Sequence, residues 1–183
     1  MKKHILLLLG AVLLSSSAFA QKMETGFFVG AGSGANVGIT GEHYENRVTS
    51  HLGVGLNVNI YGGYWFHPSW GARIGYQGVN TSSTYIDFGS TRFAYIHADA
   101  LCRPLPCVMP YLHVGALCMD KWLLAGGAGV SLPVELTSRV SLVPDLKAIF
   151  LSPKGFSENR SGLSMVISAS LGVHVALGKL KKK

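Results

Sequence analysis

The chain has 183 residues, a net charge of +7, a mean hydropathy of +0.31 and 23 glycines. Its length suits one domain, and much of its basic charge lies at residues 179–183, which favours a solvated tail over a nucleic-acid interface. The hydropathy is high for a water-soluble domain, yet no apolar run after residue 20 could form a spanning helix. This combination favours a membrane β-barrel, in which the lipid-facing residues are dispersed at alternate positions.

Residues 1–20 have the features of a secretory signal peptide. Two lysines precede an apolar run from Ile5 to Leu14, and Ala18-Phe19-Ala20 fits a cleavage site. The run is too short to cross about 30 Å of hydrocarbon, and Gln21 rather than Cys follows it, so neither a retained helix nor a lipid anchor is indicated. We expect a mature domain at 21–183 with a net charge of +5, because removing two lysines leaves 14 basic and 9 acidic residues.

Alternation of apolar with polar or small residues then predicts eight strands. In chain order they cover residues 25–39, 52–66, 70–79, 92–102, 111–118, 127–136, 140–150 and 162–177. The first is rich in glycine, Pro144 in the seventh predicts a bulge or bend, and the eighth alternates most strictly. The predicted fold class is all-β, an eight-stranded antiparallel up-and-down transmembrane β-barrel. The alternative is a soluble, lipocalin-like barrel with polar residues outside and apolar residues inside.

The connectors between the predicted strands alternate in length. Segments 40–51, 80–91, 119–126 and 151–161 are longer and polar, segments 67–69 and 137–139 are tight turns, and the proline-rich segment Arg103–Pro110 is long for a turn. This pattern predicts long outer loops, short periplasmic turns and both termini in the periplasm. Seven aromatic residues near the periplasmic strand ends predict an interfacial girdle: Phe27, Phe28, Tyr64, Trp65, Phe66, Trp70 and Tyr111.

Four stretches of the mature chain carry a family resemblance. They are NVNIYGGYWFHPSWGARIGYQG within 56–78, YIHADAL at 95–101, PYLHVGAL at 110–117 and SLGVHVALGK at 170–179. With them the chain resembles the outer-membrane β-barrel domain proteins of Bacteroides-like bacteria, similar in shape to OmpA and OmpX. The resemblance implies a location in the outer membrane and insertion by the barrel-assembly machinery. The family's last strand usually ends on an aromatic residue, whereas this one offers His174, Val175 and Leu177.

The inward positions collect the charged residues of the predicted strands. The predicted polar cluster inside the barrel is Arg73, His97, Asp99, His113, Glu135, Asp145, Lys147 and His174, with Asn36, Asn57 and Asn59 around it. An eight-stranded barrel is narrow enough to be filled by its own side chains, so buried charges inside it must pair. We therefore expect a salt-bridge plug, and the alternative is a narrow gated pore in which Arg73 or Lys147 exchanges partners.

Catalytic and metal-binding patterns are weak in this sequence. His97 and Asp99 could orient each other, but they point inward and no serine is placed beside them, so no catalytic residue is predicted and a lipid-modifying enzyme remains an alternative. Cys102 and Cys107 could form a disulfide or stay as thiols, and Cys118 is expected to face lipid. No cofactor is predicted. The exposed pair His43 and His51 could bind a metal but more often such histidines are solvated, so no metal site is predicted.

The sequence predicts a structural or surface-interaction role for a small barrel in the bacterial outer membrane. Surface loops on rigid scaffolds often bind partners, so segments 40–51 and 80–91 are expected to meet an unknown extracellular partner. The other expected contacts are with outer-membrane lipids and the assembly machinery. Nucleic acid is not expected as a partner, and we expect a monomer.

Overall fold

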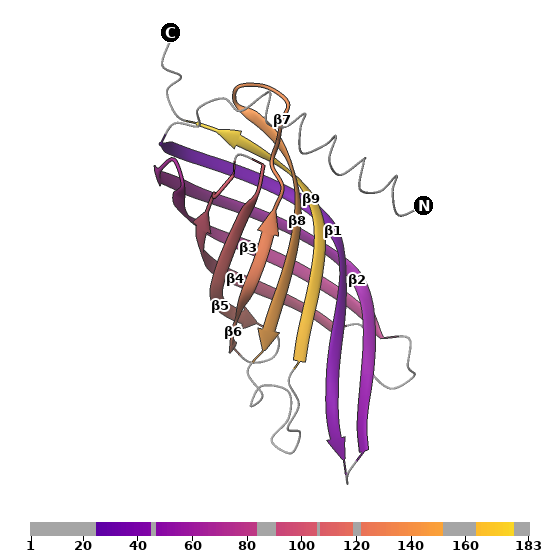
Figure 1. The fold of residues 1–183 in the computed structure, drawn as a ribbon. Coiled ribbons are helices and arrows are strands. Elements are labelled where there is room, and N and C mark those ends of the chain that lie inside the picture. The colour runs from indigo at the N-terminus through magenta and orange to yellow at the C-terminus, as the bar shows by residue number, and fades with distance from the viewer. Residues whose placement is uncertain are drawn as a thin grey trace, which may run out of the picture.

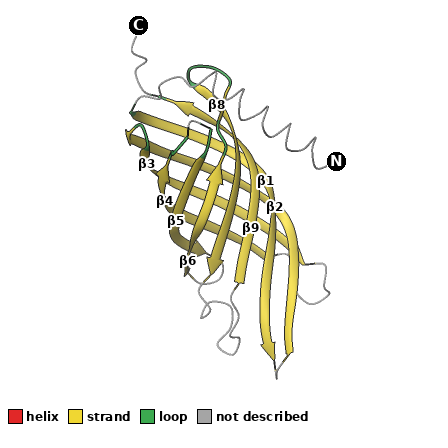
Figure 2. Ribbon diagram, in the orientation of Figure 1, coloured by secondary structure: helices red, strands yellow, loops and turns green. Residues whose placement is uncertain are grey.

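The computed structural model describes residues 25–44, 47–83, 91–105, 107–118, 122–151 and 164–177, and these residues form a closed sheet. The strands are β1 (Gly26–Tyr44), β2 (Arg47–His67), β3 (Trp70–Ser83), β4 (Thr91–Cys102), β5 (Met109–Cys118), β6 (Trp122–Ser131), β7 (Val134–Glu135), β8 (Val140–Leu151) and β9 (Ser164–Ala176). Figure 2 shows strands and connecting loops among them, and no helix in the described residues could cross a membrane.

All pairings in the sheet are antiparallel, and two of them close the barrel. Neighbours in sequence pair from β1 to β6, β1 pairs with β9, and β8 pairs with β9, β7 and β6. The short strand β7 continues β6 after a break at Leu132 and Pro133, and both pair with β8. The barrel therefore has eight strand positions, as the alternation predicted (Figure 1).

The two faces of the wall follow the predicted alternation. Outward positions carry large apolar side chains such as Leu56, Ile74 and Leu112, which are 73%, 68% and 68% exposed. The inward neighbours Arg73 and His113 are only 4% and 5% exposed. A lipocalin-like barrel would have the opposite facing, so the soluble alternative is wrong.

Several strands run further than the pattern indicated. β1 and β2 continue through segment 40–51, with pairs up to Tyr44 and Arg47, so the predicted first loop is largely a hairpin of two strands. β6 begins at Trp122 inside the predicted loop 119–126. Polar residues suit a two-stranded ribbon with water on both faces. Backbone hydrogen bonding between the strands therefore continues past the residues whose apolar alternation predicts a strand. Segment 152–163 lies outside the described residues.

The predicted aromatic girdle is only partly correct. Phe27, Tyr64, Phe66 and Trp70 are 65%, 40%, 59% and 52% exposed on the outside of the wall. Phe28, Trp65 and Tyr111, in contrast, are 2% to 3% exposed and point into the barrel. Adjacent residues of a strand face opposite sides, so consecutive aromatics cannot all reach the lipid.

Candidate functional site

The centre of the barrel interior holds a buried ion pair between neighbouring strands. Arg73 of β3 is the register partner of Asp99 of β4, and its Nε donates a hydrogen bond to the Asp99 carboxylate. Their side chains are 4% and 0% exposed. His97 lies two residues from Asp99 on the same face and donates from Nδ1 to Oδ1 over 2.5 Å. One carboxylate thus accepts from two buried donors.

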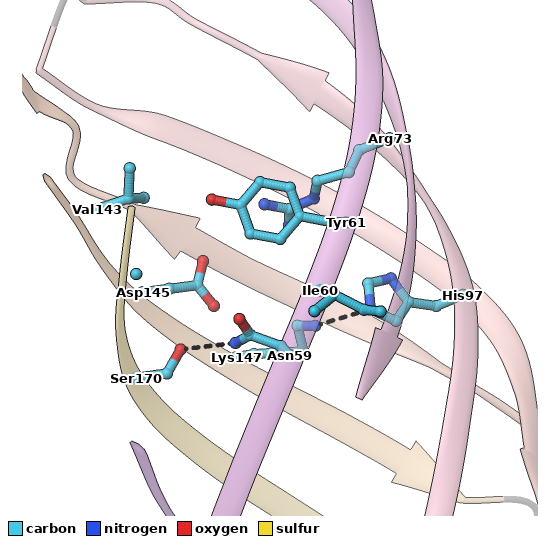
Figure 3. A pocket seen from close by; sticks show the side chains of 10 residues that line it. Asn59, Ile60, Tyr61, Arg73, His97, Val143, Asp145, Lys147 and Ser170 are labelled. Atoms are coloured by element: carbon cyan, nitrogen blue, oxygen red, sulfur yellow. Dashed lines mark hydrogen bonds between the residues drawn. The ribbon is translucent and has the colours of Figure 1, made fainter. Parts of the chain in front are cut away.

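Lys147 connects this pair to the opposite wall. Its Nζ lies 3.2 Å from Gln77 Oε1. The same nitrogen lies 3.2 Å from His97 Nε2 (Figure 3). An ammonium group only donates, so Nε2 of His97 is the acceptor and the ring proton is on Nδ1, where it points to Asp99. Gln77 Nε2 donates in turn to Ser168 Oγ over 3.0 Å. A continuous hydrogen-bonded chain therefore crosses the barrel from His97 of β4 to Lys147 of β8, back to Gln77 of β3 and on to Ser168 of β9.

Asp145 forms a second acceptor beside the chain. The hydroxyl of Tyr111 donates to both carboxylate oxygens at 3.0 and 2.9 Å, and Ser131 Oγ donates to Oδ1 at 2.5 Å. The Tyr111 ring also lies 4.5 Å from the guanidinium carbon of Arg73, and the Tyr61 ring lies 4.8 Å from the same carbon. Arg73 is thus held by a carboxylate and by two aromatic rings.

The remaining predicted cluster residues lie at the margins of this network. His113 accepts from the Tyr95 hydroxyl through Nδ1 at 2.7 Å and donates from Nε2 to the Ala148 carbonyl at 3.1 Å. His174 stacks on the Phe28 ring, with centroids 4.5 Å apart, and meets the Tyr61 ring edge-on with centroids 6.3 Å apart. Glu135 is half-buried in β7, near the end that holds the termini.

Arg103, which the sequence analysis placed in a turn, packs on the ring of the buried Trp65. It follows β4, and its guanidinium carbon lies 4.5 Å from the centroid of the Trp65 ring. Burial lowers the pKa of Arg103 to about 10, although the Glu135 carboxylate acts in the opposite direction. With Arg103 and Glu135 included, three basic and three acidic residues face each other in the interior and its mouth. The sequence did hold a signal for the inward position of Arg103. It lies two residues after Leu101 and so continues the inward alternation of β4.

Two apolar layers enclose the polar network. On the side of the termini the layer consists of Phe28, Trp65, Leu101, Met109 and Tyr111. On the side of the loops it consists of Val79, Phe93, Tyr95, Leu117, Ala125, Ile149, Leu151 and Val166. Between the two layers lies a small cavity lined by residues that include Asn59, Arg73 and Lys147. The volume open to the centre of a water molecule is about 10 Å³, which is about enough for one water molecule. The described interior is a packed plug.

Among the described residues, the His97–Asp99 pair is not joined to a serine, and no cluster of metal ligands is found. Both ring nitrogens of His97 are engaged, with Asp99 and Lys147, so neither faces a serine hydroxyl. No three His, Cys, Asp or Glu side chains come together as metal ligands in the described ranges. Cys102, Cys107 and Cys118 form no disulfide in this structure. His43 and His51 lie on the β1–β2 hairpin, and their side chains are outside the description.

Comparisons with known proteins bear on the fold. No protein-family model matches the chain, and no curated protein matches it, so the resemblance to the Bacteroides-type family stays a prediction. Among solved structures, Neisserial surface protein A is 16% identical with a TM-score of 0.54 over 85% of this chain and 100% of its own. Ail, the attachment invasion locus protein of Yersinia pestis, is 15% identical with a TM-score of 0.56 over 83% of this chain and 99% of its own. The chain therefore has the fold of the eight-stranded outer-membrane β-barrels.

Proposed function

We propose that this protein is an outer-membrane barrel that acts through contacts at the cell surface, with an interior that serves only to hold the barrel together. One observation carries the proposal: the charged side chains at the centre of the described interior are hydrogen-bonded between two apolar layers, whereas the β1–β2 hairpin extends past the other strands at the loop end (Figure 1). A function carried by the interior would need space or a reactive group there. A function carried by the exposed hairpin needs only a rigid support.

The apolar outer wall supports the membrane location. Leu124 and Trp122 of β6 are 69% and 63% exposed, and similar residues cover the outward positions of the other long strands. In water such a wall would be one large apolar patch, whereas in a bilayer it is the expected lipid-facing surface. The expected signal peptide at 1–20 lies outside the described residues, and export through it belongs to this proposal.

The two alternatives find less support in the interior. A gated pore would require Arg73 or Lys147 to change partners and both apolar layers to open as well. A lipid-modifying enzyme needs its nucleophile and base near the outer leaflet, yet the His97–Asp99 pair is enclosed between the two layers.

The hairpin has the properties of a docking element. The last partner of β1 in β9 is Ser164, opposite Thr40, and the last partner of β2 in β3 is Ser83, opposite Gly53. In the described pairings residues 41–44 and 47–50 pair only with each other, so both edges of this ribbon offer backbone donors and acceptors. Ail has been solved with the heparin analogue sucrose octasulfate, which suggests a sulfated polysaccharide as the first probe.

Shortening the hairpin tests the proposal. Residues 42–49 are replaced by Asn-Gly, which leaves the Gly41–Ser50 pair to flank a two-residue turn of the type that hairpins prefer. Cells that display the protein are then tested for retention on a heparin-coated surface, and the shortened variant is expected to lose retention. The shortened variant should show the same mobility difference between boiled and unboiled samples on a gel as the wild type. This verifies that the barrel still folds.

The matched control shortens a turn at the opposite end. Replacing residues 137–139 by Asn-Gly leaves Leu136 and Val140, which are joined by a backbone hydrogen bond of 2.9 Å, on either side of the new turn. This variant should retain the cells as the wild type does. If the wild type is not retained and purified protein carries a steady ion current across planar bilayers, the surface role is wrong and the pore is favoured.

A further inference from the structure

The outer wall contains a furrow on the loop side of strands β2 to β5. Its volume is about 470 Å³, which lies in the range of small-molecule sites. The furrow is lined by Leu56, Val58, Tyr76, Gly78, Val79, Asn80, Phe93, Ala94 and Cys118. None of these residues is acidic, and most are apolar. The furrow is continuous with the apolar wall on either side, so whatever fills it must be compatible with lipid.

The strand register explains why the wall is recessed here. Gly78 pairs with Ala94, and Ala94 pairs with Cys118, so three small residues stand side by side across β3, β4 and β5. Val58, the partner of Gly78 in β2, is 58% exposed and forms one bank. A Cβ atom placed on Gly78 would lie 3.5 Å from Val58 and 3.7 Å from the Tyr76 ring, which are ordinary contacts. The floor of the furrow is therefore open to a larger side chain without backbone strain.

The two ends of the furrow differ in polarity. Towards the middle of the wall it is bounded by Tyr76, whereas towards the loops it ends at the exposed side chain of Asn80. The register partner of Asn80 in β4 is Arg92, so the sequence places a basic residue at that level of the wall. Asn80 is four positions along the strand from Tyr76, which is roughly 13 Å. An apolar trough that ends at a cationic position matches a lipid with an acyl chain and an anionic headgroup.

We propose that this furrow binds one acyl chain of an anionic lipid of the outer leaflet, with the lipid phosphate at the level of Asn80 and Arg92. The inference rests on the membrane location proposed above, but not on the partner of the hairpin. A larger side chain on the floor of the furrow should displace the acyl chain of the lipid. Removing the charge at residue 92 should remove the preference for an anionic headgroup.

The test is native mass spectrometry of the full-length protein released from vesicles of phosphatidylcholine with a minor fraction of phosphatidylglycerol. The wild type is expected to retain one phosphatidylglycerol, and Gly78→Leu is expected to lower its occupancy about tenfold, since the new side chain displaces contacts of about two methylene groups. Gly62→Leu is the matched control, because Gly62 also faces outward and a Cβ there meets nothing closer than 3.7 Å. It should retain the lipid as the wild type does.

Further variants decide each part of the proposal. Arg92→Gln should reduce the preference for phosphatidylglycerol over phosphatidylcholine about fivefold. If Gly78→Leu does not fold, Ala94→Leu fills the same floor and Ala98→Leu, an exposed position on the same strand, is its control. Equal retention by the filled and control variants overturns the site, and equal retention of both lipids by the wild type overturns the anionic assignment. If the wild type showed no mobility difference between boiled and unboiled samples, or stayed soluble without detergent, the membrane location would instead be contradicted.

Discussion

Replacing Asp99 with alanine removes the acceptor on which the central network depends. The carboxylate is fully buried, receives Arg73 Nε and His97 Nδ1, and faces Arg73 directly in the strand register. Asp145 lines the same cavity as Arg73, but its carboxylate is already engaged by Tyr111 and Ser131. In the variant the guanidinium group would thus stay buried without a carboxylate of its own.

The expected loss of stability follows from the burial of the pair. Breaking a buried ion pair by removing one partner costs about 3–5 kcal/mol, because an uncompensated charge remains. The contacts of Arg73 with the Tyr61 and Tyr111 rings persist in the variant, so they do not add to the loss. His97 also loses an acceptor, but the two effects share one site and are not additive. We therefore expect a total loss of about 3–5 kcal/mol.

The assay is equilibrium unfolding by urea of the barrel refolded into vesicles, followed by tryptophan fluorescence and gel mobility. The double variant Arg73→Met/Asp99→Leu removes both charges and should recover most of the loss, since apolar pairs of similar size can replace a buried ion pair. A single variant within about 1 kcal/mol of the wild type, or a double variant as unstable as the single one, would refute the assignment of Asp99 as the central acceptor.

Three further variants test the packing around the pair. Lys147→Ala should lower the free energy of unfolding by about 2 kcal/mol, because two acceptors lose their donor, and should give no steady current in planar bilayers. Tyr111→Phe should lower it by about 1–3 kcal/mol in the same urea titration, because the hydroxyl that donates to a buried carboxylate is lost. Gly127→Ala, whose Cβ would meet the Ala148 carbonyl, should cost about 1–3 kcal/mol, whereas Gly62→Ala should change stability by less than about 0.5 kcal/mol, as gel-shift titrations would measure.

The strands were predictable wherever one face meets lipid and the other the interior. The seventh predicted strand, at 140–150, agrees with β8, Val140–Leu151, to within one residue. Lipid on one face and the polar interior on the other impose a clear alternation on this strand. Beyond the barrel rim this contrast ends, and the pattern gave no sign that β1 continues to Tyr44. Pairing in that region depends on backbone hydrogen bonds, which leave little trace in composition.

The members of the candidate site were predictable, but their partners were not. Alternation alone placed Arg73, His97, Asp99 and Lys147 inside the barrel. Which acid meets which base depends on the register between strands joined by longer connectors, and segment 84–90 between β3 and β4 does not fix that register from its sequence. The inward aromatics were missed for a related reason: Phe28 and Trp65 suit either a girdle or an interior layer, and only their parity along the strand distinguishes the two.

The buried network also explains how such a register is held. A slip of one residue between β3 and β4 would turn Arg73 or Asp99 towards lipid, which is costly for either charge. A slip of two residues keeps both inside but places Arg73 opposite His97 or Leu101 instead of Asp99. The apolar layers above and below separate the network from bulk water, so a displaced charge there would be poorly solvated. The central ion pair therefore selects one pairing of the two strands, a role that requires its burial and needs no open path through the barrel.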